Sequence, residues 1–341
     1  MGGEPNGLHQ TFSFGSNGYH SDDLGHGCVL MGTVEFQHFW NALDACFESP
    51  LGRKLIYAAT DAEELIIAKA DRFAYGRWFG RRRAEVALQH RSVIMGWGRI
   101  QPDAISHPAH DALSVGFSLA HKEHLEGRRF NVDWHQHSAD AITTTFKPKD
   151  GEMTAPLPPR SPSWSGRIAT PSGTNSPQPE LDVRESGFFL GEARSMFLPV
   201  DVFHHLFAVL AGRPTVAAST SGDVHVVESV DEPAVLRAII HAACAAFERT
   251  NRPIYVQSAS DWDGHFTVHF TERGWGRVEV EQSVLDGEQA TLFYVESPVV
   301  PFVLGSLVGM WKRAHGKRVE STVEPYKNGW RIALSEPTVD Y

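Results

Sequence analysis

The chain has 341 residues, 42% hydrophobic and 21% charged, with a net charge of −10. This composition predicts a globular protein with room for two domains, and the acidic charge argues against a nucleic-acid-binding surface. Three widely spaced cysteines fit reduced thiols in a cytoplasmic protein, and the longest apolar stretch, Val299 to Trp311, is too short to cross a bilayer.

The first half begins with a segment of low complexity. Residues 1–30 are rich in Gly, Asn, Ser and His without periodicity, which predicts a flexible tail. Residues 31–147 form the first expected α+β domain. Its expected elements are two helices, a strand and a terminal hairpin: Val34–Phe47 and Asp61–Phe79, then Val86–Arg99, then Arg128–His135 with Ala141–Phe146.

A linker is expected at residues 148–185, where eight prolines occur among Ser, Thr and Gly. Such a composition buries little apolar surface and favours a semi-extended chain. The linker divides the protein into two domains, the second of which covers residues 186–341.

The second domain has the clearer pattern. Asp231-Glu232-Pro233 is a typical helix start, and Ser297-Pro298 repeats the pattern before the most apolar segment of the chain. Four strands between the two helices and a hairpin after them are also expected: Ile254–Gln257, Phe266–Phe270, Val278–Glu281 and Ala290–Val295, then Arg318–Val323 with Trp330–Leu334. These elements predict an α+β fold with an antiparallel sheet covered by helices.

A tetrapeptide occurs twice, as Gly96-Trp97-Gly98-Arg99 and Gly274-Trp275-Gly276-Arg277. β-type runs follow both copies at the same offset of 178 residues, Ala112–Ser118 and Ala290–Ser297. The repetition predicts two related domains in which the tetrapeptide marks the start of a strand. After Ser118 the correspondence breaks, so we expect the first copy to be degenerate and its last long helix to be shortened or absent.

The stretch from Gly274 to Leu334 resembles the ligand-binding domain named after 4-vinyl reductase, whose fold is shared with subunits of the TRAPP vesicle-tethering complex. The matching residues are Gly274-Trp275-Gly276, Val295-Glu296-Ser297-Pro298, Gly305, Gly309, and Gly316 to Val319 with Glu324 and Gly329. The resemblance implies a TRAPP-like α/β plait that binds a small molecule. Members with zinc hold it with cysteines near the terminal hairpin, and no cysteine follows Cys244, so the resemblance carries no metal site over.

The same region is similar to the D subunit of bacterial cellulose-synthase operons. The shared features are the Trp-Gly strand start and the spacing of Val303, Leu304, Leu307, Gly309 and Trp311. That family is a non-catalytic oligomeric scaffold, so the resemblance implies an accessory role in exopolysaccharide synthesis.

Candidate ligand or interface residues lie on and beside the apolar helix. Gly305 and Gly309 stand one turn apart, which allows a backbone or a flat ligand to approach closely. With Trp275, Phe302 and Trp311 they could pack onto the domain's own sheet, form a subunit interface or line an apolar pocket.

Histidines are the other candidate chemistry. His121, His124, His135 and His137 are candidate metal ligands at the divergent end of the first half, although their spacing matches no established zinc motif. Solvated or hydrogen-bonded histidines are the simpler interpretation. Asp261 and Asp263, followed by Gly264, are expected in a turn rather than as catalytic carboxylates.

The sequence thus predicts a non-enzymatic binding or adaptor protein without a cofactor. Its second domain would recognise a small apolar ligand or a protein partner, and a homo-oligomer is expected. The alternatives are an oligomeric scaffold of cellulose or exopolysaccharide synthesis and a metal-dependent enzyme that uses the first-half histidines.

Overall fold

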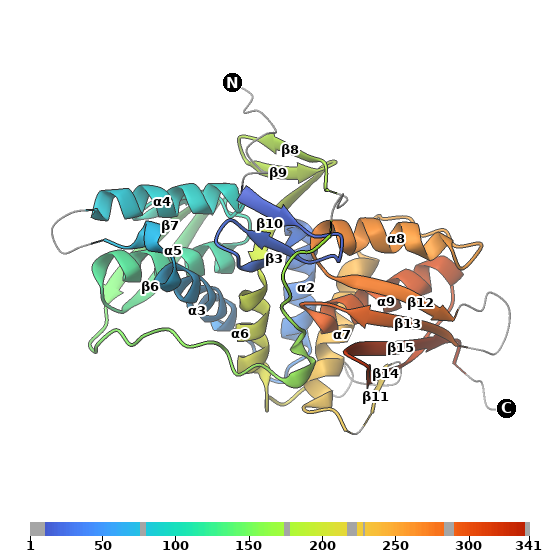
Figure 1. The fold of residues 1–341 in the computed structure, drawn as a ribbon. Coiled ribbons are helices and arrows are strands. Elements are labelled where there is room, and N and C mark those ends of the chain that lie inside the picture. The colour runs from blue at the N-terminus through green and yellow to red at the C-terminus, as the bar shows by residue number, and fades with distance from the viewer. Residues whose placement is uncertain are drawn as a thin grey trace.

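The computed structural model describes residues 11–75, 80–173, 178–216, 224–227, 229–282 and 290–337. Its centre is an antiparallel sheet in the order β1-β2-β3-β10-β9-β8, to which each half of the chain gives three strands. In Figure 1 the strands β3 and β10 lie between a left lobe from the first half and a right lobe from the second. The strands are β1 (Phe12–Phe14), β2 (His20–Asp22), β3 (Gly27–Gly32), β8 (Leu181–Arg184), β9 (Gly187–Leu190) and β10 (Ala193–Pro199).

The first half continues from β3 into helices and a small sheet. The sheet is antiparallel, in the order β4-β5-β7-β6. The helices are α2 (Thr33–Ala45), α3 (Lys54–Lys69), α4 (Arg81–Ile94) and α5 (Asp111–Glu126), with a short 3₁₀ helix, η2 (Asp71–Phe73). The strands are β4 (Arg99–Ile100), β5 (Ala104–Ser106), β6 (Phe130–Ser138) and β7 (Ala141–Pro148).

The second half continues from β10 in the same way. Its sheet has the order β11-β14-β15-β13-β12, antiparallel except for the parallel pair β11–β14. The helices are α6 (Val200–Leu210), α7 (Pro233–Glu248), α8 (Asp261–His269) and α9 (Val300–His315), with the 3₁₀ helix η5 (Thr271–Arg273). The strands are β11 (Val224–Val226), β12 (Arg277–Gln282), β13 (Thr291–Glu296), β14 (Glu320–Tyr326) and β15 (Gly329–Ser335).

The two halves interlock around β3 and β10. Leu30 and Phe197 face each other in this antiparallel pair. Trp97 donates its indole N–H to the carbonyl oxygen of Phe197 at 2.8 Å, and Trp275 donates to that of Leu30 at 3.0 Å. In addition, α2 packs on α7 and α3 packs on α6. Each half therefore completes its core with elements of the other half.

The repeated tetrapeptide has the same role in both halves. Gly98 (φ 102°) and Gly276 (φ 95°) adopt a left-handed backbone, and strands β4 and β12 begin at the next residue. A Cβ at these glycines would lie 2.6 Å from the carbonyl oxygen of His107 and 2.1 Å from that of Glu296. Glycine is therefore required twice over, by conformation and by space.

Two further glycines allow helices to cross closely. A Cβ on Gly116 of α5 would lie 2.5 Å from the carbonyl oxygen of Ile56 in α3. A Cβ on Gly305 of α9 would lie 2.3 Å from the carbonyl oxygen of Ile240 in α7. The helix pairs α3–α5 and α7–α9 thus cross in the same way.

The predicted class, mixed α/β with antiparallel sheets, is confirmed, but several elements were predicted wrongly. Val86–Arg99 lies mostly in α4, Ala112–Ser118 in α5 and Phe266–Phe270 mostly in α8, while Ile254–Gln257 forms no strand. In α5 every residue from Leu113 to His121 is buried, so hydrophobic alternation there does not indicate a strand. Short apolar runs are ambiguous in this way.

The predicted loss of the long apolar helix from the first half is also wrong. Helices α5 and α9 have 16 residues each. Helix α5 begins at residue 111 and α9 at residue 300, so the offset has grown beyond 178 residues, because β12 and β13 are longer than β4 and β5 and lie further apart in the sequence.

The tail and the linker also differ from expectation. Residues 1–10 lie outside the described part of the chain, but residues 12–30 include three strands, and Cys28, Val29 and Leu30 are buried. The prediction of a flexible tail is therefore wrong for this stretch. In the linker, Trp164 is fully buried within the 3₁₀ helix η3 (Ser163–Ser165) and donates its indole N–H to the carbonyl oxygen of Asp231.

The described helices include none that is long and apolar enough to span a membrane.

Candidate functional site

A cavity of about 860 Å³ lies where the first half meets the second. It is bounded by the start of α2, the turn between β9 and β10, the segment after α7, and the helices α8 and η5. Its volume is in the range of small-molecule sites in proteins. The side chains that line it include both charged and apolar groups, so the cavity suits a ligand with both characters.

Two arginines share one carboxylate in this cavity. Arg252 makes a bidentate ion pair with Glu35, with one N–H···O distance of 3.0 Å. Arg273 is 8% exposed, and its nearest guanidinium nitrogen is 3.9 Å from the same carboxylate. Its Nε donates to the carbonyl oxygen of Val268 at 3.0 Å. We call Arg252, Arg273 and Glu35 the arginine pair and its carboxylate. With two cations and one anion, this group carries one excess positive charge.

The excess positive charge is reflected in neighbouring pKa values. Burial, and then the Arg252 charge, lower the pKa of Arg273 to about 10, so the side chain stays cationic at neutral pH. Burial, followed by the charges of Arg273 and Arg252, lowers the pKa of His269 to about 3. An anion in the cavity would be favoured by the same positive field.

His269 offers a neutral hydrogen-bonding group in the same cavity. The residue is 8% exposed, and its Nδ1 has no hydrogen-bond partner within the part of the chain that the structure describes. Buried polar atoms are normally paired, so an unpaired one that lines a cavity indicates a place for a ligand atom.

The segment after α7 is held in position by Arg313 of α9. Its guanidinium donates to the carbonyl oxygens of Arg252 at 2.6 Å and Glu248 at 2.8 Å, and it lies 4.9 Å from the ring centre of Phe247. These contacts satisfy the carbonyls at the C-terminus of α7 and complement the negative end of its dipole. They place Arg252 opposite Glu35 on the first-half helix α2.

The opposite wall carries another cation, which is partly buried. Arg194 of β10 donates to the carbonyl oxygens of Pro108 and His107 in the first half, and its Nε has no partner among the described residues. Burial lowers the pKa of Arg194, and the nearby charge of Asp140 acts in the opposite direction. This arginine therefore joins the two halves at the cavity.

Apolar side chains form the rest of the lining. Val34 of α2 and Val268 of α8 are 66% and 47% exposed, and Phe189 and Leu190 of β9 are partly buried. With Pro253 they give the cavity an apolar wall beside its charged one. These side chains offer an apolar contact surface to a ligand in the cavity.

The residues predicted from the apolar helix lie in the core, and none of them lines this cavity. Trp275 stacks on Phe302 with ring centres 4.2 Å apart, and both side chains are buried. Gly305 and Gly309 contact α7, where a Cβ at Gly309 would lie 2.9 Å from the ring of Phe247.

Trp311 is buried next to His315. The glycine-bearing face of α9 is therefore covered by a helix of the same chain and not by the sheet.

The four candidate metal ligands do not come together. His121 is buried and lies 3.3 Å from Glu63, whereas the Nε2 atom of His124 contacts the carbonyl oxygen of Phe73 at 3.0 Å. His135 and His137 are exposed on β6, with ring centres 4.7 Å apart. No group of three or more His, Cys, Asp or Glu side chains in the described ranges could hold a metal ion.

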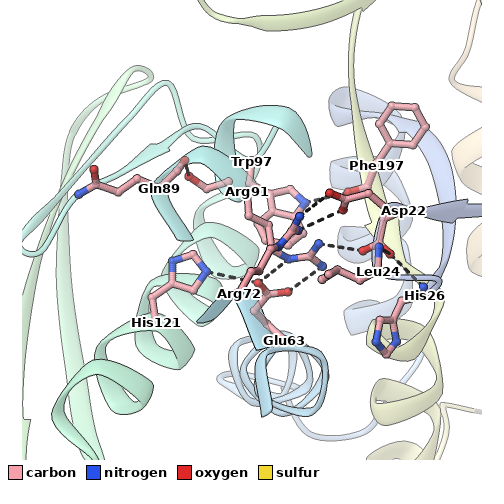
Figure 2. Close-up of polar contacts among 12 residues, drawn as sticks. Asp22, Leu24, His26, Glu63, Arg72, Gln89, Arg91, Trp97, His121 and Phe197 are labelled. Atoms are coloured by element: carbon pink, nitrogen blue, oxygen red, sulfur yellow. Dashed lines mark hydrogen bonds and ion pairs between the residues drawn. The ribbon is translucent and has the colours of Figure 1, made fainter. Parts of the chain in front are cut away.

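His121 belongs to a buried cluster of charges instead. Figure 2 shows Arg91 between Glu63 and Asp22, with His121 on the other side of Glu63. Arg91 and Glu63 are fully buried, and Asp22 is nearly so. Burial raises the pKa of Glu63, but the Arg91 charge and the His121 contact outweigh it and keep the pKa low.

Sequence reasoning missed the cavity. Glu35 and Arg252 are 217 residues apart, and neither belongs to a motif. His265 and His269 stack one turn apart on α8, where a strand was predicted at Phe266–Phe270, with ring centres separated by 6.2 Å. Asp261 begins α8 and accepts two backbone N–H groups, from Gln257 and Ser258.

Comparisons with family models, with curated proteins and with solved structures give no match to this chain. The similarity to the 4-vinyl-reductase-type domain and to the cellulose-synthase D subunit therefore stays a prediction from the sequence. The geometry of the cavity is the observation from which a function can be argued.

Proposed function

We propose that the protein is a non-enzymatic binding protein that holds a small organic anion in the cavity between its two halves. The observation that carries this proposal is the arginine pair and its carboxylate, which leave one buried positive charge uncompensated. Burying such a charge is unfavourable unless it is paired, so an anionic ligand would relieve the cost. The apolar wall of Phe189, Leu190 and Val268 supports a ligand that also has an apolar part.

The two halves, we also propose, are copies of one α+β unit with the TRAPP-like plait that the sequence resemblance implies. The shared strand order, the two tryptophan hydrogen bonds and the glycine contacts of α5 and α9 support this proposal. In such an arrangement the cavity lies between copies and uses Glu35 from the first and Arg273 from the second. A small-molecule role is also what the resemblance implies.

The fluorescent probe 1-anilinonaphthalene-8-sulfonate, an apolar monoanion, tests this function on the full chain. We expect saturable binding with increased fluorescence. Arg273→Met removes the charge while keeping an apolar side chain, and it should weaken binding at least about tenfold, since a hydrogen bond to a charged group contributes about 1.5–3 kcal/mol. Arg273→Lys, which keeps the charge, should lose less.

The matched control is Arg81→Met at the start of α4, whose side chain is 57% exposed and pairs with Glu126 away from the cavity. It should bind the probe as the unchanged chain does. Far-UV circular dichroism and the thermal midpoint show whether each variant is folded, because partly unfolded chains also bind this probe. Equal probe binding by folded Arg273→Met and Arg81→Met proteins would rule out the cavity as the binding site.

A further inference from the structure

The two halves place different side chains at the same position relative to the repeated tetrapeptide. Arg91 stands six residues before Trp97, and His269 stands six residues before Trp275. Arg91 lies on α4, the helix before the first tetrapeptide, and contacts Asp22 beside the turn between β2 and β3. His269 lies on α8, the helix before the second tetrapeptide, and lines the cavity that the turn between β9 and β10 borders.

In the first half this space is filled by the protein's own side chains. Arg91 donates to Asp22 at 2.8 Å and to both carboxylate oxygens of Glu63, at 2.8 and 3.2 Å (Figure 2). Leu24 packs against a small apolar cluster that includes Ile67 and Leu88. A buried cation is thus matched by carboxylates, with an apolar group next to them.

The difference between the halves follows from the two turns. Four residues, 23–26, separate β2 from β3, whereas only Gly191 and Glu192 separate β9 from β10. The longer turn carries Leu24 and follows Asp22, which occupy the space beside α4. The shorter turn inserts no side chain in this way, because Gly191 has none and the carboxylate of Glu192, at the edge of the cavity, is 95% exposed and lies 3.8 Å from Arg184. The cavity beside α8 remains open as a result.

We infer that the ligand of the cavity is a monocarboxylate with an apolar body, bound once per chain in the place that Asp22 and Leu24 take in the first half. This inference rests on the proposed function and narrows it to one chemical class. The carboxylate would meet Arg273 and the unpaired Nδ1 of His269, and the apolar body would cover Val34 and Val268.

The charge count favours a carboxylate over a phosphate. The arginine pair and its carboxylate carry one excess positive charge, which a monoanion bound at Arg273 neutralises, whereas the further cation Arg194 lies on the opposite wall and donates to backbone carbonyl oxygens. A phosphate dianion would leave a negative charge next to Glu35, which is itself buried. An unpaired buried charge of either sign is costly, so the dianion should bind more weakly.

Isothermal titration calorimetry on the full chain at pH 8 tests the inference with three probes of matched length: octanoate, octanamide and octyl phosphate. We expect octanoate to bind with one site per chain and octanamide to bind at least about tenfold more weakly, because the amide lacks the charge. Octyl phosphate should also bind more weakly than octanoate. Arg273→Met should reduce the difference between octanoate and octanamide, and Arg81→Met should leave it unchanged.

The outcomes separate this inference from the proposed function. Octyl phosphate binding as tightly as octanoate would overturn the choice of a carboxylate while leaving an anion site in place. Two equivalent octanoate sites per chain would overturn the claim that the first half fills its own site. If none of the three probes nor the fluorescent sulfonate binds, the proposed function itself fails.

Discussion

Replacing Gly305 by alanine should destabilise the protein because the close crossing of α7 and α9 leaves no room for a methyl group. The new Cβ would lie 2.3 Å from the carbonyl oxygen of Ile240 and 2.6 Å from the Cβ of Ala243. Ordinary contacts of this kind are about 3.5 Å, so the helices would have to separate by roughly 1 Å. Backbone atoms cannot rotate away, which places the cost near the upper end of the ~1–3 kcal/mol range for overpacked cores.

Part of this cost is offset because alanine favours a helix over glycine by about 1 kcal/mol. We therefore expect a net loss of about 2 kcal/mol for Gly305→Ala. Gly309→Ala is the matched control on the same helix. Its nearest contacts would be the Cδ1 and Cβ atoms of the buried Phe247 side chain, at 2.9 and 3.2 Å, and no backbone atom, so the loss should be smaller than at Gly305.

Urea denaturation followed by circular dichroism measures both changes as shifts in the midpoint. Gly116→Ala in α5 should lose about as much stability as Gly305→Ala, because its Cβ would meet the backbone of α3 at 2.5 Å. A Gly305→Ala protein as stable as the unchanged chain would refute the reasoning, as would equal losses at Gly305 and Gly309.

Two further predictions concern the join between the halves and the cavity. Trp97→Phe and Trp275→Phe each remove an N–H donor and leave a buried carbonyl oxygen unpaired. Each should therefore lower the free energy of unfolding by about 1–3 kcal/mol in the same urea assay. Unchanged stability of both variants would show that the hydrogen bonds do not join the halves. Unfolded His269 titrates near its ordinary pKa of 6.5 and folded His269 near 3, so the unfolded chain binds an extra proton between these values and stability falls as the pH is lowered through this window. His269→Phe should reduce the slope of stability against pH by up to about 1.4 kcal/mol per unit there, measured by urea denaturation from pH 7 to pH 4, and an unchanged slope would contradict it.

The sequence predicted the elements whose signals are local. Pro233 begins α7, and the tetrapeptide glycines precede strands in both halves, because each of these depends on backbone conformation at one or two residues. The segment Ala112–Ser118 was predicted wrongly because burial on every side removes the periodicity that separates helix from strand.

The cavity could not be predicted because it depends on contacts between distant parts of the chain. Glu35 meets Arg252 only after α2 packs on the second-half helix α7. The candidate residues Trp275 and Gly305 were prominent in the sequence because tight packing restricts them, and the structure places them in the core. Prominent motifs in this chain therefore indicate packing, whereas the candidate site consists of residues outside any motif.

A crystal structure of the full chain with octanoate tests the central claim most directly. The account predicts one octanoate per chain, with its carboxylate within hydrogen-bond distance of Arg273 or His269 and its alkyl chain against Val268 and Leu190. Octanoate bound elsewhere, with the cavity beside α8 occupied only by water, would contradict the account.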